Sequence, residues 1–272
     1  NIPLDVELPP IALDLGFTLS DPRITARDAL TLAMRGEIRQ RGPVQAPHDS
    51  PGIPAVGLEA DPIWPIDAGA AFAVRLLTVN ALLDAVWRQG ALQLDLTALL
   101  TESVSGVIRA GRIDARLPPL VVPGARGGPY AFEVQIGELD LYLQTLLSPA
   151  EDHYALSLRA GLILEVGDGG IRFAVADEPD LRVALIEAGG DEPGLPPDAL
   201  ARLLGPVVWG EVQNAVGEGL DLAIDPIVIG PDAFAELAPS IQGIDVGLTF
   251  PGQPTVRNGY FVFGAGLDLT VR

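Results

Sequence analysis

The sequence contains neither cysteine nor lysine. Without cysteine, the chain has no disulfide, no thiolate ligand for a metal ion and no cysteine nucleophile. All 17 basic side chains are arginine, and 36 acidic side chains outnumber them, which gives a net charge of −19. A surface of that charge repels phosphate backbones, so we expect no nucleic acid partner.

Residues that often carry catalysis are also scarce. There are two histidines, His48 in a proline-rich stretch and His153 in an expected loop, and their separation in sequence indicates no metal site. We find no Gly-x-Ser-x-Gly elbow, phosphate-binding loop or dinucleotide fingerprint. Asp177, Glu178 and Asp180 lack the spacing of a calcium-binding loop. We therefore expect no catalytic residue, no metal and no cofactor, and a protein that is not an enzyme.

No stretch of the sequence predicts a transmembrane helix. The best candidate, residues 68–83, is interrupted by Arg75 and followed by Asp84. The chain begins at Asn1 without a methionine, a basic segment or an apolar leader, which favours a processed chain whose signal peptide has been removed. Together with the arginine bias and the missing cysteine, this indicates an exported bacterial protein that is periplasmic, outer-membrane-associated or secreted.

Apolar residues, by contrast, are abundant. They make up 48% of the chain against 19% charged residues, which is more than an ordinary core needs and predicts an apolar cavity, interface or membrane contact. The 31 glycines and 25 prolines separate short runs in which apolar and polar residues alternate. Alternation predicts an antiparallel sheet with one apolar face. The runs are 11–19, 30–38, 92–96, 132–136, 139–143, 156–164, 171–175, 181–185, 244–250 and 261–269, with a hairpin turn expected at 167–170.

Two segments have helical periodicity instead. Residues 76–89 repeat apolar side chains at helical spacing and are followed by Gly90, which suits the position just past a helix end. A second helix is expected over about 196–216, apolar on most of its circumference and kinked at Pro206. Such a helix must be buried on nearly all sides, so we expect a sheet wrapped around it. The predicted fold class is α+β, mostly antiparallel β: a highly curved sheet, or half-open barrel, around a long proline-kinked C-terminal helix, with a shorter first helix.

Local motifs accompany this order of elements. Residues 80–92 place an asparagine ten positions before a glycine, with an aromatic residue between them and a strand after. Residues 258–265 read Asn-Gly-Tyr-Phe-Val-Phe-Gly-Ala, Gly36-Glu37-Ile38 precedes the proline-rich stretch, and residues 195–216 hold the long second helix. In these features the chain resembles the C-terminal half of the bactericidal/permeability-increasing protein family. That family includes lipopolysaccharide-binding, phospholipid-transfer and cholesteryl-ester-transfer proteins, all of the tubular lipid-binding superfamily.

The resemblance implies a lipid-binding fold over nearly the whole chain. It places residues 1–45 in the family's central sheet and crossing segment, and residues 46–272 in a tubular lipid-binding barrel. It also implies an elongated apolar crevice for a phospholipid, fatty acid, sterol or similar lipid, used for transport or sequestration with transient membrane contact. A chain of net charge −19 lacks the family's cationic tips, so we expect apolar carriage rather than recognition of lipid A by charge. The residues expected to line the crevice are Leu83, Val86, Trp87, Phe132, Val134, Leu203, Val207, Val208, Phe261 and Phe263.

Two other functions remain open from the sequence. A structural or interaction domain would fill its barrel with its own side chains and expose a large apolar patch elsewhere. A hydrolase of an unrecognised type would cluster carboxylates of raised pKa in a polar cleft. A lipid carrier predicts instead a continuous apolar tunnel and a co-purifying ligand. A homodimer is compatible with the sequence.

Overall fold

The structure is a computed structural model of mixed helix and strand content. It describes residues 13–19, 23–24, 30–31, 33–54, 61–65, 69–96, 107–125, 130–146, 148, 150–167, 170–175, 179–191, 194–206, 222–223, 227–229, 244–249 and 255–271. The strands are β1 (Leu13–Leu19), β2 (Arg23–Ile24), β3 (Leu30–Thr31), β4 (Met34–Gln40), β5 (Ala70–Arg75), β6 (Gln93–Asp95), β7 (Ile108–Ala115), β8 (Leu120–Pro123), β9 (Phe132–Thr145), β10 (Asp152–Gly167), β11 (Gly170–Val175), β12 (Asp180–Glu187), β13 (Leu222–Ala223), β14 (Ile227–Ile229), β15 (Ile244–Thr249), β16 (Thr255–Arg257) and β17 (Tyr260–Val271). Helix α1 spans Leu76–Arg88, and a second helix begins at residue 197 and is described as far as residue 206.

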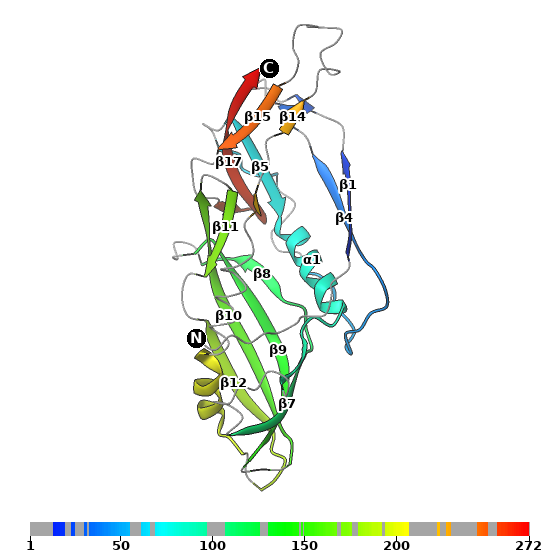
Figure 1. The fold of residues 1–272 in the computed structure, drawn as a ribbon, viewed down its shortest axis with the longest axis vertical. Helices are drawn as coiled ribbons and strands as arrows, with labels where there is room; N and C mark the ends of the chain where they lie inside the picture. Colours follow the sequence, from blue (N-terminus) through cyan, green and yellow to red (C-terminus); the bar gives the residue numbers. More distant parts are fainter. Residues whose placement is uncertain are drawn as a thin grey trace.

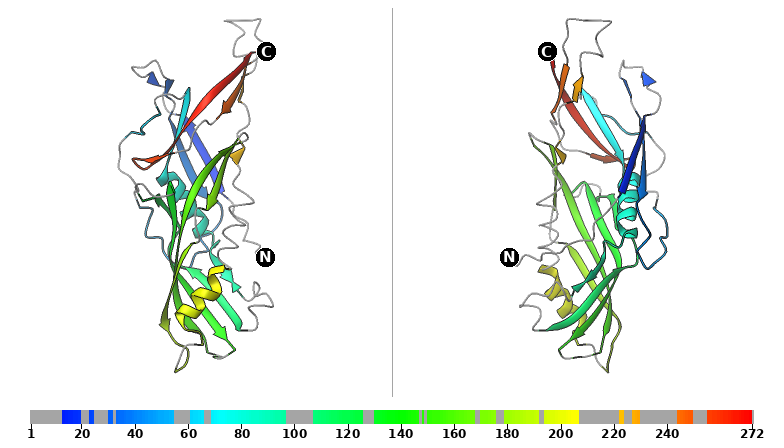
Figure 2. Two further views of the ribbon diagram at one scale, coloured as in Figure 1. Left: turned by 90° about the vertical axis from the view of Figure 1, so that its left-hand side faces the viewer. Right: turned by 45° about the vertical axis from the view of Figure 1, so that its right-hand side comes forward.

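All strand pairings in the described residues are antiparallel, which confirms the predicted α+β class. The main sheet has eight strands in the order β13-β11-β10-β9-β7-β6, with β12 beside β10 and β8 beside β9. A five-stranded sheet, β14-β15-β17-β16 with β5 beside β17, lies at the other end of an elongated molecule (Figure 1). Seen from two further sides, the eight-stranded sheet is curved, and within the described residues it closes into no barrel (Figure 2).

The two longest strands, β9 and β10, keep their apolar side chains on one face, which we call the inner face. Leu141 pairs with Tyr154, Leu139 with Leu156, and Phe132 with Leu162, and paired residues point to the same side of a sheet. The register shifts once, because Leu156 pairs with Leu139 but Leu158 pairs with Ile136. Strand β9 therefore carries one extra residue at Gly137–Glu138, and Glu138 has φ of 49°. The sequence runs 132–136 and 139–143, of opposite phase, are thus one strand with a bulge.

Helix α1 is fastened along the edge of this sheet by two buried polar side chains two turns apart. Asn80, 1% exposed, donates from Nδ2 to the carbonyl oxygen of Val121 over 3.1 Å and accepts from its N–H at Oδ1 over 2.7 Å. The indole N–H of Trp87 donates to the carbonyl oxygen of Ala115 over 2.7 Å. Val121 lies in β8 and Ala115 ends β7, so one helix bridges the two strands that share an edge of β9.

Both ends of α1 are closed by backbone groups of distant segments. No side chain caps its first turn, and the N–H of Leu76 donates instead to the carbonyl oxygen of Gly259 over 2.8 Å. Asn258 and Gly259 both have positive φ and join β16 to β17 in a two-residue hairpin turn, as expected for an Asn-Gly pair. At the other end, Gly90 has φ of 77° and the carbonyl oxygen of Arg88 accepts from the N–H groups of residues 45 and 46. The predicted end of the first helix is confirmed.

The described part of the second helix packs against the opposite end of the inner face. Leu200 is fully buried with Leu141, Leu143 and Tyr154, and Leu203 lies partly buried against the same cluster. The helix begins beside Pro196 and Pro197, as predicted from the sequence. Pro206 is the last described helical residue. The residues after it, on which the expected length to Val216 and a kink at Pro206 depend, lie outside the described residues.

A buried carboxylate holds the chain that leads into this helix. Asp152 accepts from the N–H of Gly189 over 2.9 Å and from the N–H of Gly194 over 2.8 Å, and it is fully buried. Tyr154, on the next inner-face position of β10, donates its hydroxyl to the carbonyl oxygen of Leu195 over 2.7 Å. Two neighbouring side chains of one strand thereby fix the loop and the start of the second helix.

The alternation of apolar and polar residues predicted many of the strands but not all of them. Strands are present in the expected runs 11–19, 92–96, 156–164, 171–175, 181–185, 244–250 and 261–269, and Gly167 pairs with Gly170 where the hairpin was expected. The expected run 30–38 is instead two strands, β3 and β4, which belong to different sheets. Strands β2, β5, β7, β8, β13, β14 and β16 were not predicted. His153 was expected in a loop but lies in β10, where its Nε2 is 2.8 Å from Oδ1 of Asp140. The division into residues 1–45 and 46–272 stays a prediction.

We expect Asn80→Ala to lower the free energy of unfolding by about 1–3 kcal/mol, because it leaves a buried N–H and a buried C=O of Val121 unpaired. The measurement is urea unfolding followed by circular dichroism. Thr78→Ala, at an exposed position of the same helix, is the control and should change stability little. Equal losses in the two variants would contradict the anchoring role.

Burial, with the negative charge of Asp152 beside it, raises the pKa of Tyr154 from 10.0 to about 12. Because the folded protein holds this proton more tightly than the unfolded chain, the free energy of unfolding should fall as pH rises from about 10 through 12. The absorbance of the Tyr154 phenolate is the difference between the spectra of the wild-type protein and the Tyr154→Phe variant. In a pH titration this difference should develop only near pH 12. A difference spectrum that is half-developed at pH 10 would show that Tyr154 is accessible to solvent.

Candidate functional site

Five of the ten predicted crevice residues come together at one end of the inner face. Leu83, Val134, Phe261 and Phe263 pack partly buried against a cluster that contains buried Phe132. They come from α1, β9 and β17, so the cluster joins the helix to both large sheets. All five are apolar and present no charge to this part of the inner face.

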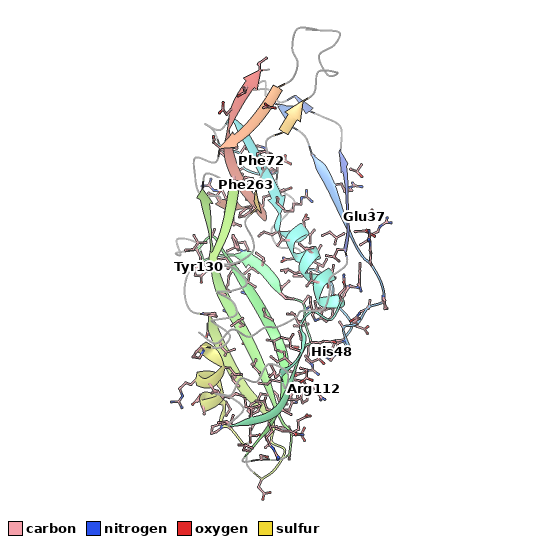
Figure 3. All side chains as sticks on the ribbon, in the orientation of Figure 1. Glu37, His48, Phe72, Arg112, Tyr130 and Phe263 are labelled. Carbon is pink, nitrogen blue, oxygen red and sulfur yellow. The ribbon has the colours of Figure 1, made fainter. Side chains whose placement is uncertain are left out.

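The phenylalanines of this cluster form a connected series of rings. Phe132 meets Phe261 edge to face at 5.7 Å between ring centroids, and Phe261 meets Phe263 at 5.7 Å. Phe263 stacks on Phe72 at 5.5 Å, its partner in the pairing of β17 with β5 (Figure 3). Phe72 is 37% exposed, so the series runs from the buried inner face to the surface. Such aromatic pairs stabilise beyond the area they bury.

The other five predicted crevice residues do not belong to this cluster. Trp87 is 2% exposed, and its indole N–H donates to the carbonyl oxygen of Ala115, so we assign Trp87 to holding α1 on the sheet. Val86 is partly buried. Leu203 belongs to the cluster at the far end of the inner face, with Leu200 and Leu204. Val207 and Val208 lie outside the described residues.

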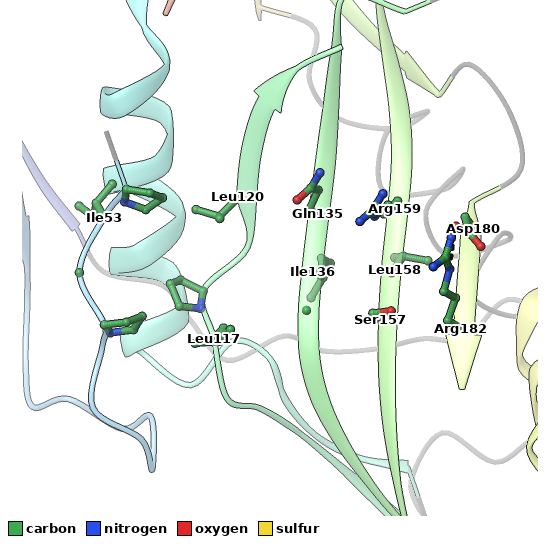
Figure 4. A pocket seen from close by; sticks show the side chains of 15 residues that line it. Ile53, Leu117, Leu120, Gln135, Ile136, Ser157, Leu158, Arg159, Asp180 and Arg182 are labelled. Atoms are coloured by element: carbon green, nitrogen blue, oxygen red, sulfur yellow. Dashed lines mark hydrogen bonds and ion pairs between the residues drawn. The ribbon is translucent and has the colours of Figure 1, made fainter. Parts of the chain in front are cut away.

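A cleft of about 490 Å³ opens on the opposite side of the eight-stranded sheet (Figure 4). Leu120 pairs with Gln135, Gln135 with Arg159, and Ser157 with Arg182, so these side chains share the face away from Phe132 and Leu141. We call this the outer face and the cavity the outer cleft. Its apolar walls include Ile53, Leu117, Leu120, Pro51, Pro54 and Pro118; its polar side chains are Gln135, Ser157, Arg159, Asp180 and Arg182.

No pattern in the sequence predicted the outer cleft. Gln135, Arg159 and Arg182 alternate with apolar residues and look like the solvated side of an amphipathic sheet, which is the usual reading of such a pattern. Residues 51–54 are separated from them by more than 60 positions. The one local signal is the proline content of both 51–54 and 117–119, which marks segments that cannot extend a strand ladder.

A second polar group on the outer face lies toward the other end of the sheet. Asp140 is buried, with Arg116 Nε at 3.0 Å and His153 Nε2 at 2.8 Å from its two oxygens. The rings of His153 and Tyr142 stack with their centroids 4.4 Å apart, and the guanidinium carbon of Arg112 lies 4.2 Å from the centroid of the Tyr142 ring. These side chains bind one another, so we assign this group to holding β7, β9 and β10 together.

The described residues contain no group of three or more histidine, aspartate or glutamate side chains arranged to hold a metal ion. His48 Nε2 lies 3.3 Å from Oδ2 of Asp114, which places the His48 ring against β7. Of the helices in the part of the chain described, none has the length and apolar character needed to span a membrane.

No protein-family model matches the chain, and no curated protein matches it in sequence. Among solved structures, the crystal structure of a lipopolysaccharide-binding protein is similar, with a TM-score of 0.38 and 15% sequence identity. The alignment covers 94% of this chain and 54% of that one, so the chain spans about half the length of the protein it matches.

Proposed function

We propose that this protein binds a lipid or similar apolar molecule on the inner face of its eight-stranded sheet and carries or sequesters it. The observation that supports this is the continuity of one apolar face over β9 and β10, with a helix against each end. Leu158 and Ala160 lie between the two helix-bound clusters and belong to neither, so apolar side chains connect one cluster with the other.

Binding on such a face needs burial alone. Each CH₂ group that leaves water contributes roughly 0.8 kcal/mol, less the free energy lost in ordering the ligand. A headgroup can remain in water, so no charge is required on the inner face. The proposal therefore includes no catalytic step, metal or cofactor, and it includes transient contact with the membrane that supplies the lipid. We extend it to an exported, periplasmic or secreted protein on the composition of the chain.

A structural or interaction domain is the second candidate. Phe72 and Val74 of β5 and Leu77 of α1 are each between 37% and 39% exposed and lie on neighbouring elements. Exposed apolar side chains grouped in this way often mark a surface for another protein. On this reading the two clusters of the inner face are simply the core, and the ligand-binding assay below separates the two functions.

The test is native mass spectrometry of the purified protein, combined with lipid analysis of its organic extract. We expect a stoichiometric lipid-sized adduct that is lost in Val134→Trp, because the larger ring fills the inner face. Gln144→Trp, on the outer face of the same strand, is the matched control and should keep the adduct. Should Val134→Trp fail to fold, Leu83→Trp on α1 fills the same cluster from the other side.

A clean mass without adduct, both as purified and after incubation with mixed phospholipids and fatty acids, would overturn the carrier proposal. Loss of the adduct in Gln144→Trp and not in Val134→Trp would place the ligand on the wrong face.

A further inference from the structure

We infer that the outer cleft is a second binding site, separate from the inner face, for a single-tailed amphipathic anion. Its occupant has one linear apolar tail and one anionic head, either carboxylate or phosphate. The tail lies between residues 51–54 and the Leu117–Leu120 segment, and the head lies at Arg159. The cleft volume of about 490 Å³ is in the range of ligand pockets in proteins.

The outer cleft exists because one edge of β9 is shared by two strands. β7 pairs with Leu139 and beyond, β8 pairs with Phe132 to Gln135, and the chain crosses between them at residues 116–119. The bulge lies opposite this crossing, where the N–H of Arg116 donates to the carbonyl oxygen of Glu138 over 3.0 Å. A hypothetical Cβ on Gly137 would meet no atom within 4 Å, so the floor of the cleft is open at the bulge.

The apolar end of the cleft is positioned by a hydrogen bond that lies outside the cleft, so the surface that lines this end remains apolar. Ser50 donates its hydroxyl to Oδ1 of Asp84 on α1 over 2.7 Å, which positions the following residues 51–54 beside β8. Prolines at 51, 54 and 118 have no N–H group, so they present hydrocarbon without an unpaired donor. Partly buried Ile53, Leu117 and Leu120 complete a wall suited to an alkyl chain.

The polar end of the cleft carries an available positive charge. Arg182 donates from Nε and Nη2 to Oδ2 of Asp180, over 3.1 and 2.9 Å, so these two charges are paired with each other. Arg159 is exposed on the neighbouring strand β10, where it pairs in register with Asp180, and no hydrogen bond or ion pair joins its side chain to another described residue. The cleft thus has two arginines and one aspartate on a protein of net charge −19. An anionic head complements Arg159, and a guanidinium suits both carboxylate and phosphate.

Isothermal titration calorimetry of the full chain with decanoate, dodecanoate and tetradecanoate tests the tail. Each added CH₂ group should tighten binding by up to about fourfold while the cleft accommodates it. Dodecanol should bind at least about tenfold more weakly than dodecanoate, because it lacks the charge that Arg159 pairs with. Dodecyl phosphate should bind comparably to dodecanoate. If acetate or inorganic phosphate binds as tightly as the long-chain anions, the cleft is an anion site without a tail site and the inference fails.

Two variants locate the site. Arg159→Gln should weaken dodecanoate at least about tenfold and leave dodecanol unchanged, whereas Arg109→Gln, an exposed arginine of β7 with the same change of charge, should do neither. Leu120→Gln should weaken both ligands. Equal effects of Arg159→Gln and Arg109→Gln would overturn the inference, because the charge would then act only at long range.

The inner-face variant Val134→Trp separates this site from the proposed lipid site. Dodecanoate binding that survives Val134→Trp and is lost in Arg159→Gln supports the outer cleft, whatever the inner face binds. Dodecanoate binding lost in Val134→Trp and kept in Arg159→Gln would place the anion on the inner face and overturn the inference while leaving the carrier proposal intact.

Discussion

The extra residue in β9 at Gly137–Glu138 is the constraint on which the arrangement of this molecule depends. Side chains alternate between faces along a strand, so a regular strand would put the two apolar halves of β9 on opposite sides of the sheet. The bulge reverses the phase once and returns both halves to the inner face. It costs on the order of 1 kcal/mol for the positive φ of Glu138, and the N–H of Arg116 satisfies the carbonyl that it leaves free.

From that single apolar face follows the placement of both helices. Helix α1 packs at one end through Leu76 and Leu83, and the second helix packs at the other through Leu200. Strand β6 pairs with β7 only at residues 112–114, and no described strand pairs with the outer edge of β8. The backbone groups of Val121 and the carbonyl of Ala115 would therefore be unpaired without a cover. Asn80 and Trp87 provide that cover from α1.

The two faces of the sheet therefore offer different chemistry. The inner face is apolar from Phe132 to Leu143 on β9 and from Leu156 to Leu162 on β10, and this part suits a ligand held by burial alone. The outer face carries the polar half of each alternating strand, and the break between β7 and β8 gives it a hollow with hydrocarbon at one end and Arg159 at the other. A carrier with both would hold an apolar molecule inside and a charged amphiphile outside.

The sequence by itself determined the antiparallel class, the position and end of α1 and the apolar face of most strands. These follow from local periodicity, and the ends of α1 follow from the conformations that Gly90 and the Asn258-Gly259 pair adopt. Tertiary structure alone decided that 132–136 and 139–143 are one strand, because a bulge is defined by its partner strand. It also decided which predicted crevice residues meet, with Phe132 and Phe261 in one cluster and Leu203 in another. The outer cleft belongs to the same group, since residues 51–54, Leu120 and Arg159 become neighbours only through strand pairing over long sequence separations.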